Sequence, residues 1–128
     1  MRLRVGVSEQ GTTTTISLVG EWDLAQQPAM RRTIVNVLAR LPECVVLDLS
    51  GLDFIDSAGI HGVLELHKRS GQQQARLVIV PGGPQVQRSF ELVGLAEILP
   101  FLREGWSRGQ AAASPCLPKR PAERSFPS

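Results

Sequence analysis

The sequence predicts an α/β fold in which helices cover a mixed β-sheet, and three observations support this. Near the N-terminus, apolar residues alternate with polar ones or glycine, as in half-buried strands. Further along, apolar residues recur at helical spacing. The runs at 45–49 and 76–80 are almost continuously apolar, which is typical of inner strands covered by other elements. The chain has 128 residues, 42% of them hydrophobic, enough for one domain with a sizeable core.

The first two strands are expected to form a hairpin. Apolar or β-branched residues alternate along both of them, at Leu3, Val5 and Val7 and again at Thr14, Ile16 and Leu18. Ser8-Glu9-Gln10-Gly11 lies between the two stretches, and Gly11 is free to adopt the positive φ that a tight turn requires. The second strand is expected to end at Gly20-Glu21-Trp22-Asp23.

Residues 27–41 predict the first helix, and Pro42 ends it. One continuous apolar stripe runs along this segment, formed by Met30, Ile34, Val37, Leu38 and Leu41. The inner strand 45–49 follows, and we expect it to end in a short turn that includes Asp53.

A second helix is expected over residues 57–70, with Gly71 as its stop. Its inner stripe would consist of Ile60, Val63, Leu64 and His67. After the strand at 76–80, Pro84 begins a third helix that ends at Gly94. Residues 98–102 predict a last strand at a sheet edge, because Pro100 cannot donate to a neighbouring strand. The order β-β-α-β-α-β-α-β indicates an N-terminal hairpin followed by βαβ crossovers.

Charge divides the chain into two parts. Residues 107–128 are Pro-rich and carry four basic side chains and one acidic, whereas residues 1–106 carry a net charge of −1. We therefore expect a folded domain over residues 1–106 and a basic disordered tail over 107–128. The slightly acidic body argues against direct nucleic-acid binding. Because no apolar stretch is long enough for a membrane span or a signal peptide, we expect a cytoplasmic protein.

The strongest functional signal is Asp56-Ser57-Ala58-Gly59, which opens the second helix. A serine at a helix N-terminus is exposed and lies near backbone N–H groups that have no partner in the helix. Such a hydroxyl suits chemical modification or recognition by a partner. The alternative is a simple helix cap, because Ser and Asp are both favoured at that position.

Three motifs in this order resemble the STAS domain, and specifically the bacterial anti-sigma factor antagonists. They are Gly20-Glu21-Trp22-Asp23-Leu24, the run from Leu52 to Gly59, and the stretch from Pro84 to Leu95. The resemblance covers about residues 3–102 and implies a STAS-like mixed sheet packed with helices.

The resemblance also implies a function. The residue that matches the phosphorylated serine of that family is Ser57, and its kinase is the partner itself, an anti-sigma factor with serine kinase activity. The unphosphorylated form binds this partner and frees the sigma factor, and a serine phosphatase resets the phosphorylated form. The implied partner surface consists of Glu21, Asp23, Asp56, Ala58, Gly59 and His61. Ala58 stands where many family members have a second serine.

Several alternatives remain open on the sequence alone. Asp23 could equally cap the first helix, Trp22 could be a core residue or a binding anchor, and Gly59 and Gly62 could serve close packing or leave a bare surface. The domain could belong to a stress-sensing or lipid-trafficking complex, or the turn at Gly82-Gly83 could bind a nucleotide. We expect no catalytic residues, metal or cofactor: no P-loop lysine follows that turn, and His61 and His67 do not share a helix face.

Overall fold

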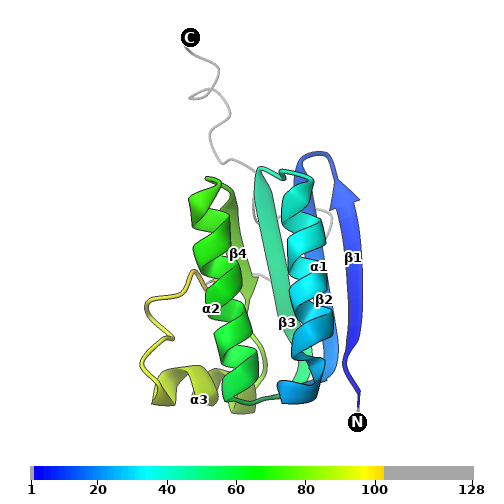
Figure 1. Ribbon diagram of the computed structural model, residues 1–128. Helices are drawn as coiled ribbons and strands as arrows, with labels where there is room; N and C mark the ends of the chain where they lie inside the picture. The colour runs from blue at the N-terminus through cyan, green and yellow to red at the C-terminus, as the bar shows by residue number, and fades with distance from the viewer. Residues whose placement is uncertain (1, 103–128) are drawn as a thin grey trace.

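The computed structural model describes residues 2–102, which form one sheet and the helices packed on it (Figure 1). The strands are β1 (Arg4–Gln10), β2 (Thr13–Trp22), β3 (Cys44–Ile55) and β4 (Arg76–Val80). A short 3-10 helix, η1 (Leu24–Gln26), leads into α1 (Gln27–Ala39), and α2 (Ser57–Gln72) and α3 (Pro84–Leu92) follow. The expected domain boundary at residue 106 and the expected tail at 107–128 lie outside the described residues.

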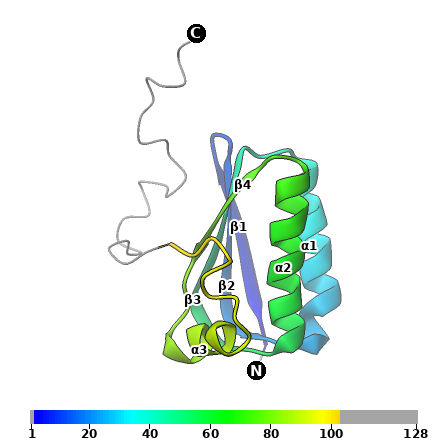
Figure 2. The same cartoon turned by 90° about the vertical axis from the view of Figure 1, so that its left-hand side faces the viewer.

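The sheet is mixed, as predicted. Its strand order is β1-β2-β3-β4, with β1 antiparallel to β2 and with β2, β3 and β4 mutually parallel. Gly11 has φ +64° in the predicted hairpin turn. The crossover helices α1 and α2 lie side by side on one face of the sheet, and α3 lies at the end where the parallel strands finish (Figure 2).

The main core lies between the sheet and the two crossover helices. On the sheet side it contains Ile16 and Leu18, and the helices contribute Met30, Ile34, Val37, Leu38, Ile60, Val63 and Leu66. The stripe predicted for the second helix was therefore partly wrong. Leu66 is fully buried, whereas His67 is only half-buried, because one residue turns the helix by about 100°.

The strand β3 is longer than the sequence indicates and continues to Ile55. The turn expected at Asp53 is wrong, since this residue lies within the strand with its side chain exposed. The pairing explains the difference: β2 runs on to Trp22, which pairs with Ile55, and two register shifts absorb the extra residues of β3.

Other predicted ends are also corrected. The first helix was expected to reach residue 41, but α1 ends at Ala39, and Leu41, expected in its apolar stripe, is 73% exposed. Gly71 lies inside α2, which continues to Gln72, and the left-handed residue after the helix is Gln74 with φ +62°. The last predicted strand, at 98–102, is only a single parallel bridge between Ile79 and Phe101. Two backbone hydrogen bonds form this bridge at the edge of β4. Within residues 2–102, no helix combines the length and apolar content that crossing a bilayer demands.

Candidate functional site

The predicted site lies at the end of the sheet where β2 and β3 finish and where α1 and α2 begin (Figure 1). Ser57 is the first residue of α2, and its side chain is exposed. Among the described residues, no hydrogen bond involves its hydroxyl. The hydroxyl is thus accessible, and it does not cap the helix, so the simple cap is excluded for this side chain.

The capping residue is Asp56. Its Oδ1 accepts a hydrogen bond from the Gly59 backbone N–H at 3.0 Å, which satisfies one of the free donors of the first turn. Its Oδ2 accepts a second bond from the Leu24 N–H at 3.2 Å. One carboxylate therefore fixes the start of α2 and also holds the loop after β2 beside it.

Asp23 is also a capping residue. Its Oδ1 accepts the Ala25 N–H at 3.1 Å, so Asp23 is the N-cap of η1. Since the next residue, Leu24, is bonded to Asp56, the two aspartates lie at adjoining helix starts. Asp23, which the family resemblance assigns to the partner surface, is therefore also a structural cap.

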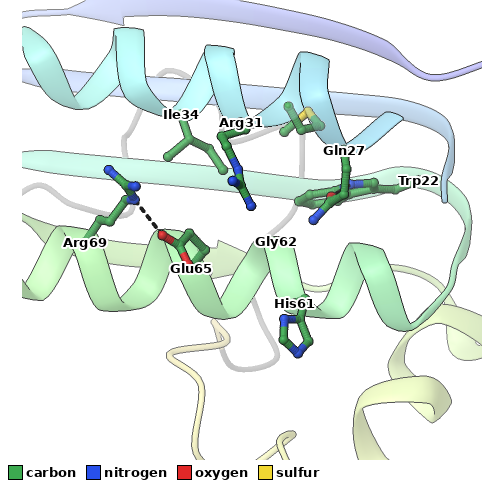
Figure 3. Close-up of a pocket in the computed structure, with 9 residues that line it drawn as sticks. Trp22, Gln27, Arg31, Ile34, His61, Gly62, Glu65 and Arg69 are labelled. Carbon is green, nitrogen blue, oxygen red and sulfur yellow. Dashed lines mark hydrogen bonds and ion pairs between the residues drawn. The ribbon is translucent and has the colours of Figure 1, made fainter. Parts of the chain in front are cut away.

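Trp22 belongs to the core, which settles the alternative left open by the sequence. Its side chain is 0% exposed, and its indole N–H donates to Gln27 Oε1 at 3.0 Å (Figure 3). The ring lies directly against α2, where a Cβ added at Gly62 would fall 2.3 Å from Cζ2 of the indole. A Cβ at Gly59 would fall 2.9 Å from the Trp22 carbonyl oxygen. Both glycines therefore allow close packing.

The residues predicted to contact a partner differ in exposure. Ser57 and His61 are exposed, and four others are half-buried: Glu21, Asp23, Asp56 and Ala58. Gly59 is buried under Trp22, so its contribution to a contact surface is indirect: it allows the packing that sets the start of α2.

Sequence reasoning missed two apolar side chains next to these residues. Leu24 is 69% exposed, and its backbone is bonded to Asp56; Phe54, two residues before Asp56, is 43% exposed. The available signal was an apolar residue directly after an aspartate, within a motif already identified: Leu24 follows the capping Asp23, and Phe54 follows Asp53 of β3.

A narrow cleft lies next to the site, between α1 and α2 (Figure 3). Arg31 from α1 and Glu65 and Arg69 from α2 line it. Arg69 Nε donates to Glu65 Oε2 at 2.7 Å, and this hydrogen bond, together with the positive charge of Arg69, lowers the pKa of Glu65. Within residues 2–102, no group of three His, Cys, Asp or Glu side chains is arranged to hold a metal ion.

The turn at Gly82-Gly83, considered as a nucleotide site, does not present the Gly82 backbone N–H to a ligand. The Gly82 N–H donates to Gln87 Oε1 at 2.9 Å, so this backbone donor already has an acceptor within the chain. A Cβ at Gly82 would fall 2.8 Å from Val86, which gives the glycine a packing role.

Comparison with known proteins agrees with this architecture. The sequence model of the STAS domain matches residues 4–104, and the chain belongs to this family. It is 43% identical over 70 residues to BtrV of Bordetella bronchiseptica, a protein named provisionally as an anti-sigma factor antagonist; that match spans 55% of this chain and 58% of BtrV.

Two further similarities extend over more of the chain. RsfB of Mycobacterium tuberculosis, an anti-sigma-F factor antagonist, is 29% identical over 93 residues, which are 73% of this chain and 75% of RsfB. Among solved structures, an anti-sigma factor antagonist from Mycobacterium paratuberculosis is 25% identical with a TM-score of 0.74, covering 87% of this chain and 92% of that one.

Proposed function

We propose that this protein is an anti-sigma factor antagonist that is switched off by phosphorylation of Ser57. The observation that carries the proposal is the exposed Ser57 hydroxyl, which makes no hydrogen bond among the described residues and lies at a helix start fixed by its neighbours. The names of the similar proteins support the class of partner, an anti-sigma factor. The protein acts as a binding switch rather than an enzyme.

The docking surface surrounds Ser57 and has apolar and acidic parts. Leu24 is the main apolar anchor, because it is the more exposed of the two apolar side chains beside the site. Its backbone is held by Asp56, so the anchor is ordered before binding and costs little conformational entropy on docking. The acidic side chains give the partner a negative surface to recognise.

Phosphorylation would change the binding surface without unfolding the domain. A phosphoserine carries about −1.5 to −2 charges near neutral pH. At the first position of α2 the helix dipole would stabilise this charge by roughly 0.3–1 kcal/mol. The cap would survive, because the N–H of Gly59 is held by Asp56 and not by Ser57.

The effect on docking depends on how far water is excluded. A unit like-charge contact at about 4 Å costs roughly 1 kcal/mol in water and roughly 4 kcal/mol at an effective dielectric constant near 20. Since about 1.4 kcal/mol is a tenfold change in affinity, only the second value gives an on/off switch. The proposal therefore requires Ser57 to be at least partly dehydrated in the complex.

The kinase and its antagonist would meet where ATP is available, and we place the protein in the cytoplasm. The partner is an anti-sigma factor with serine kinase activity, and a serine phosphatase would remove the phosphate and restore binding. Both assignments follow from the resemblance to the anti-sigma factor antagonists, and a kinase with an opposing phosphatase makes a phosphoserine switch reversible.

The test combines binding with mapping of the phosphate. Candidate anti-sigma kinases are incubated with the wild-type chain, Ser57→Ala and Ser57→Asp, with and without ATP. We expect ATP to release the wild type but not Ser57→Ala, Ser57→Asp to bind poorly throughout, and mass spectrometry to locate the phosphate on residue 57. Ser8→Ala, which changes an exposed serine on β1, is the matched control and should behave as wild type. If ATP releases Ser57→Ala as it releases the wild type, or if Ser57→Asp binds as tightly as the unphosphorylated wild type, the proposal is wrong.

A further inference from the structure

The two edges of the sheet differ in whether another segment of the chain is hydrogen-bonded to them. At the β4 edge, the Ile79 N–H donates to the Pro100 carbonyl at 2.9 Å, and the Leu102 N–H donates to the Ile79 carbonyl at 2.7 Å. The chain itself thus covers that edge. At the other edge, all seven residues of β1 are exposed, and no backbone hydrogen bond joins β1 to any described residue outside β2.

The open edge carries an apolar strip. Val5 pairs with Leu18 and Val7 with Ile16, and paired residues of antiparallel strands direct their side chains to the same face. Because Leu18 and Ile16 belong to the core under the helices, the two valines lie on the helical face of the sheet. They are nevertheless 38% and 50% exposed.

The reason for this exposure is that α1 does not close over β1. A groove separates them, lined by Val7, Glu9, Thr33, Asn36, Val37 and Arg40. Only an exposed ion pair between Arg40 and Glu9 spans it among the described residues. An exposed edge strand with an apolar strip beside an open groove is a template for pairing with another strand.

We propose that β1 is a self-association surface, on which the β1 strand of a second copy of this chain pairs antiparallel to form a continuous eight-stranded sheet. A two-fold axis perpendicular to the sheet keeps each side chain on its own face. Odd-numbered residues of β1 must therefore pair with odd-numbered residues of the second copy, and even-numbered with even-numbered. Centring it beside Gly6 places Val5 of each copy opposite Val7 of the other and brings all four valines together.

The charges of β1 fit this register. Arg4 lies opposite Ser8 of the second copy, so no like charges face each other across the new pairing. A Cβ at Gly6 has no atom within 4 Å, so the sheet face at the axis has room for a side chain introduced at this residue. The helix start that carries Ser57 lies away from this edge, toward the other side of the molecule (Figure 1), and stays exposed in such a dimer.

Sedimentation velocity of the full chain over a range of concentrations tests the proposal. We expect a dimer whose fraction rises with concentration. Val7→Lys should weaken dimerisation by about tenfold or more, because two symmetric valine pairs are lost together. Val35→Lys is the matched control, since Val35 is a similarly exposed valine of α1 (44%) that does not line the groove, and it should leave the dimer intact. A chain that is monomeric at every concentration, or a dimer unaffected by Val7→Lys, overturns the proposal.

The register has its own test. The wild type measures how much disulfide-linked dimer the native cysteines form under mild oxidation. Gly6→Cys should form more of this dimer than wild type, since residue 6 faces residue 6 of the second copy. Ser8→Cys should add none, since residue 8 faces Arg4 of the second copy. The reverse pattern would overturn the proposed register.

Discussion

The indole of Trp22 lies against the α2 backbone at Gly62, so close that a single added methyl group would fall 2.3 Å from the ring. Trp22 ends β2, bonds to Gln27 at the start of α1, and covers the first two turns of α2. This one side chain therefore fixes the relative positions of the three elements that meet around the candidate site.

Gly62→Ala is expected to destabilise the protein by up to about 2 kcal/mol, because overpacking costs about 1–3 kcal/mol. The added methyl would overpack a fully buried ring, and this cost exceeds the gain of about 1 kcal/mol in helix propensity. Gly71→Ala is the control within the same helix, because nothing lies within 4 Å of its Cβ position, and it should stabilise the protein by about 1 kcal/mol. Urea unfolding measures both, and equal effects of the two variants would contradict the packing described for Trp22.

Asp56→Ala is expected to cost about 1–2 kcal/mol of unfolding free energy, because it removes the cap of α2 and the bond to the Leu24 N–H. Asp56→Asn should lose less, since its amide oxygen still accepts the Gly59 N–H. Hydrogen exchange at Leu24 separates the two roles of the carboxylate. Faster exchange at Leu24 is expected in Asp56→Ala, and unchanged exchange would show that the bond across the two segments contributes nothing.

Ser57→Glu is expected to leave the unfolding free energy within about 1 kcal/mol of wild type, or slightly higher. The side chain at residue 57 is exposed, and a negative charge in the first turn of a helix is favourable. Thermal or denaturant unfolding compared with Ser57→Gln, a neutral variant of the same size, isolates the effect of the charge. A loss of several kcal/mol on introducing the charge would mean that phosphorylation acts by unfolding the domain.

Ser70→Ala is expected to leave the protein as stable as wild type or more stable. Ser70 is 1% exposed, and its hydroxyl has no hydrogen-bond partner among the described residues. Removing an unsatisfied buried hydroxyl recovers about 1–3 kcal/mol of desolvation cost, part of which is offset by the small cavity left behind. Calorimetric unfolding provides the measurement, and a clear loss of stability would indicate that this hydroxyl has a bonding role.

Much of the fold could be predicted because it depends on local patterns. The hairpin, the three helices and the inner strands follow from apolar spacing, and Gly11 in the hairpin turn has the expected positive φ. The errors in the predicted strands lie where pairing between distant segments decides the structure. The length of β3 depends on β2, and the fate of residues 98–102 depends on the edge of β4.

The candidate site shows the same division. The four neighbouring residues Asp56-Ser57-Ala58-Gly59 indicate that Asp56 and Ser57 begin a helix. No local pattern indicates that Asp56 also accepts a hydrogen bond from Leu24, which is 32 residues away. The exposed apolar anchor beside the serine was missed for this reason, since nothing in the local sequence around Leu24 indicates which segment lies next to it.

The sequence by itself determined the order of strands and helices and the place of one serine at a helix start, because hydrophobic period and capping act over a few residues. Only the tertiary structure decided that Trp22 is buried under α2, that one sheet edge is covered by the chain and the other is open, and which loops meet at Ser57. These features depend on contacts between segments far apart in the chain, whose free energies no local pattern records.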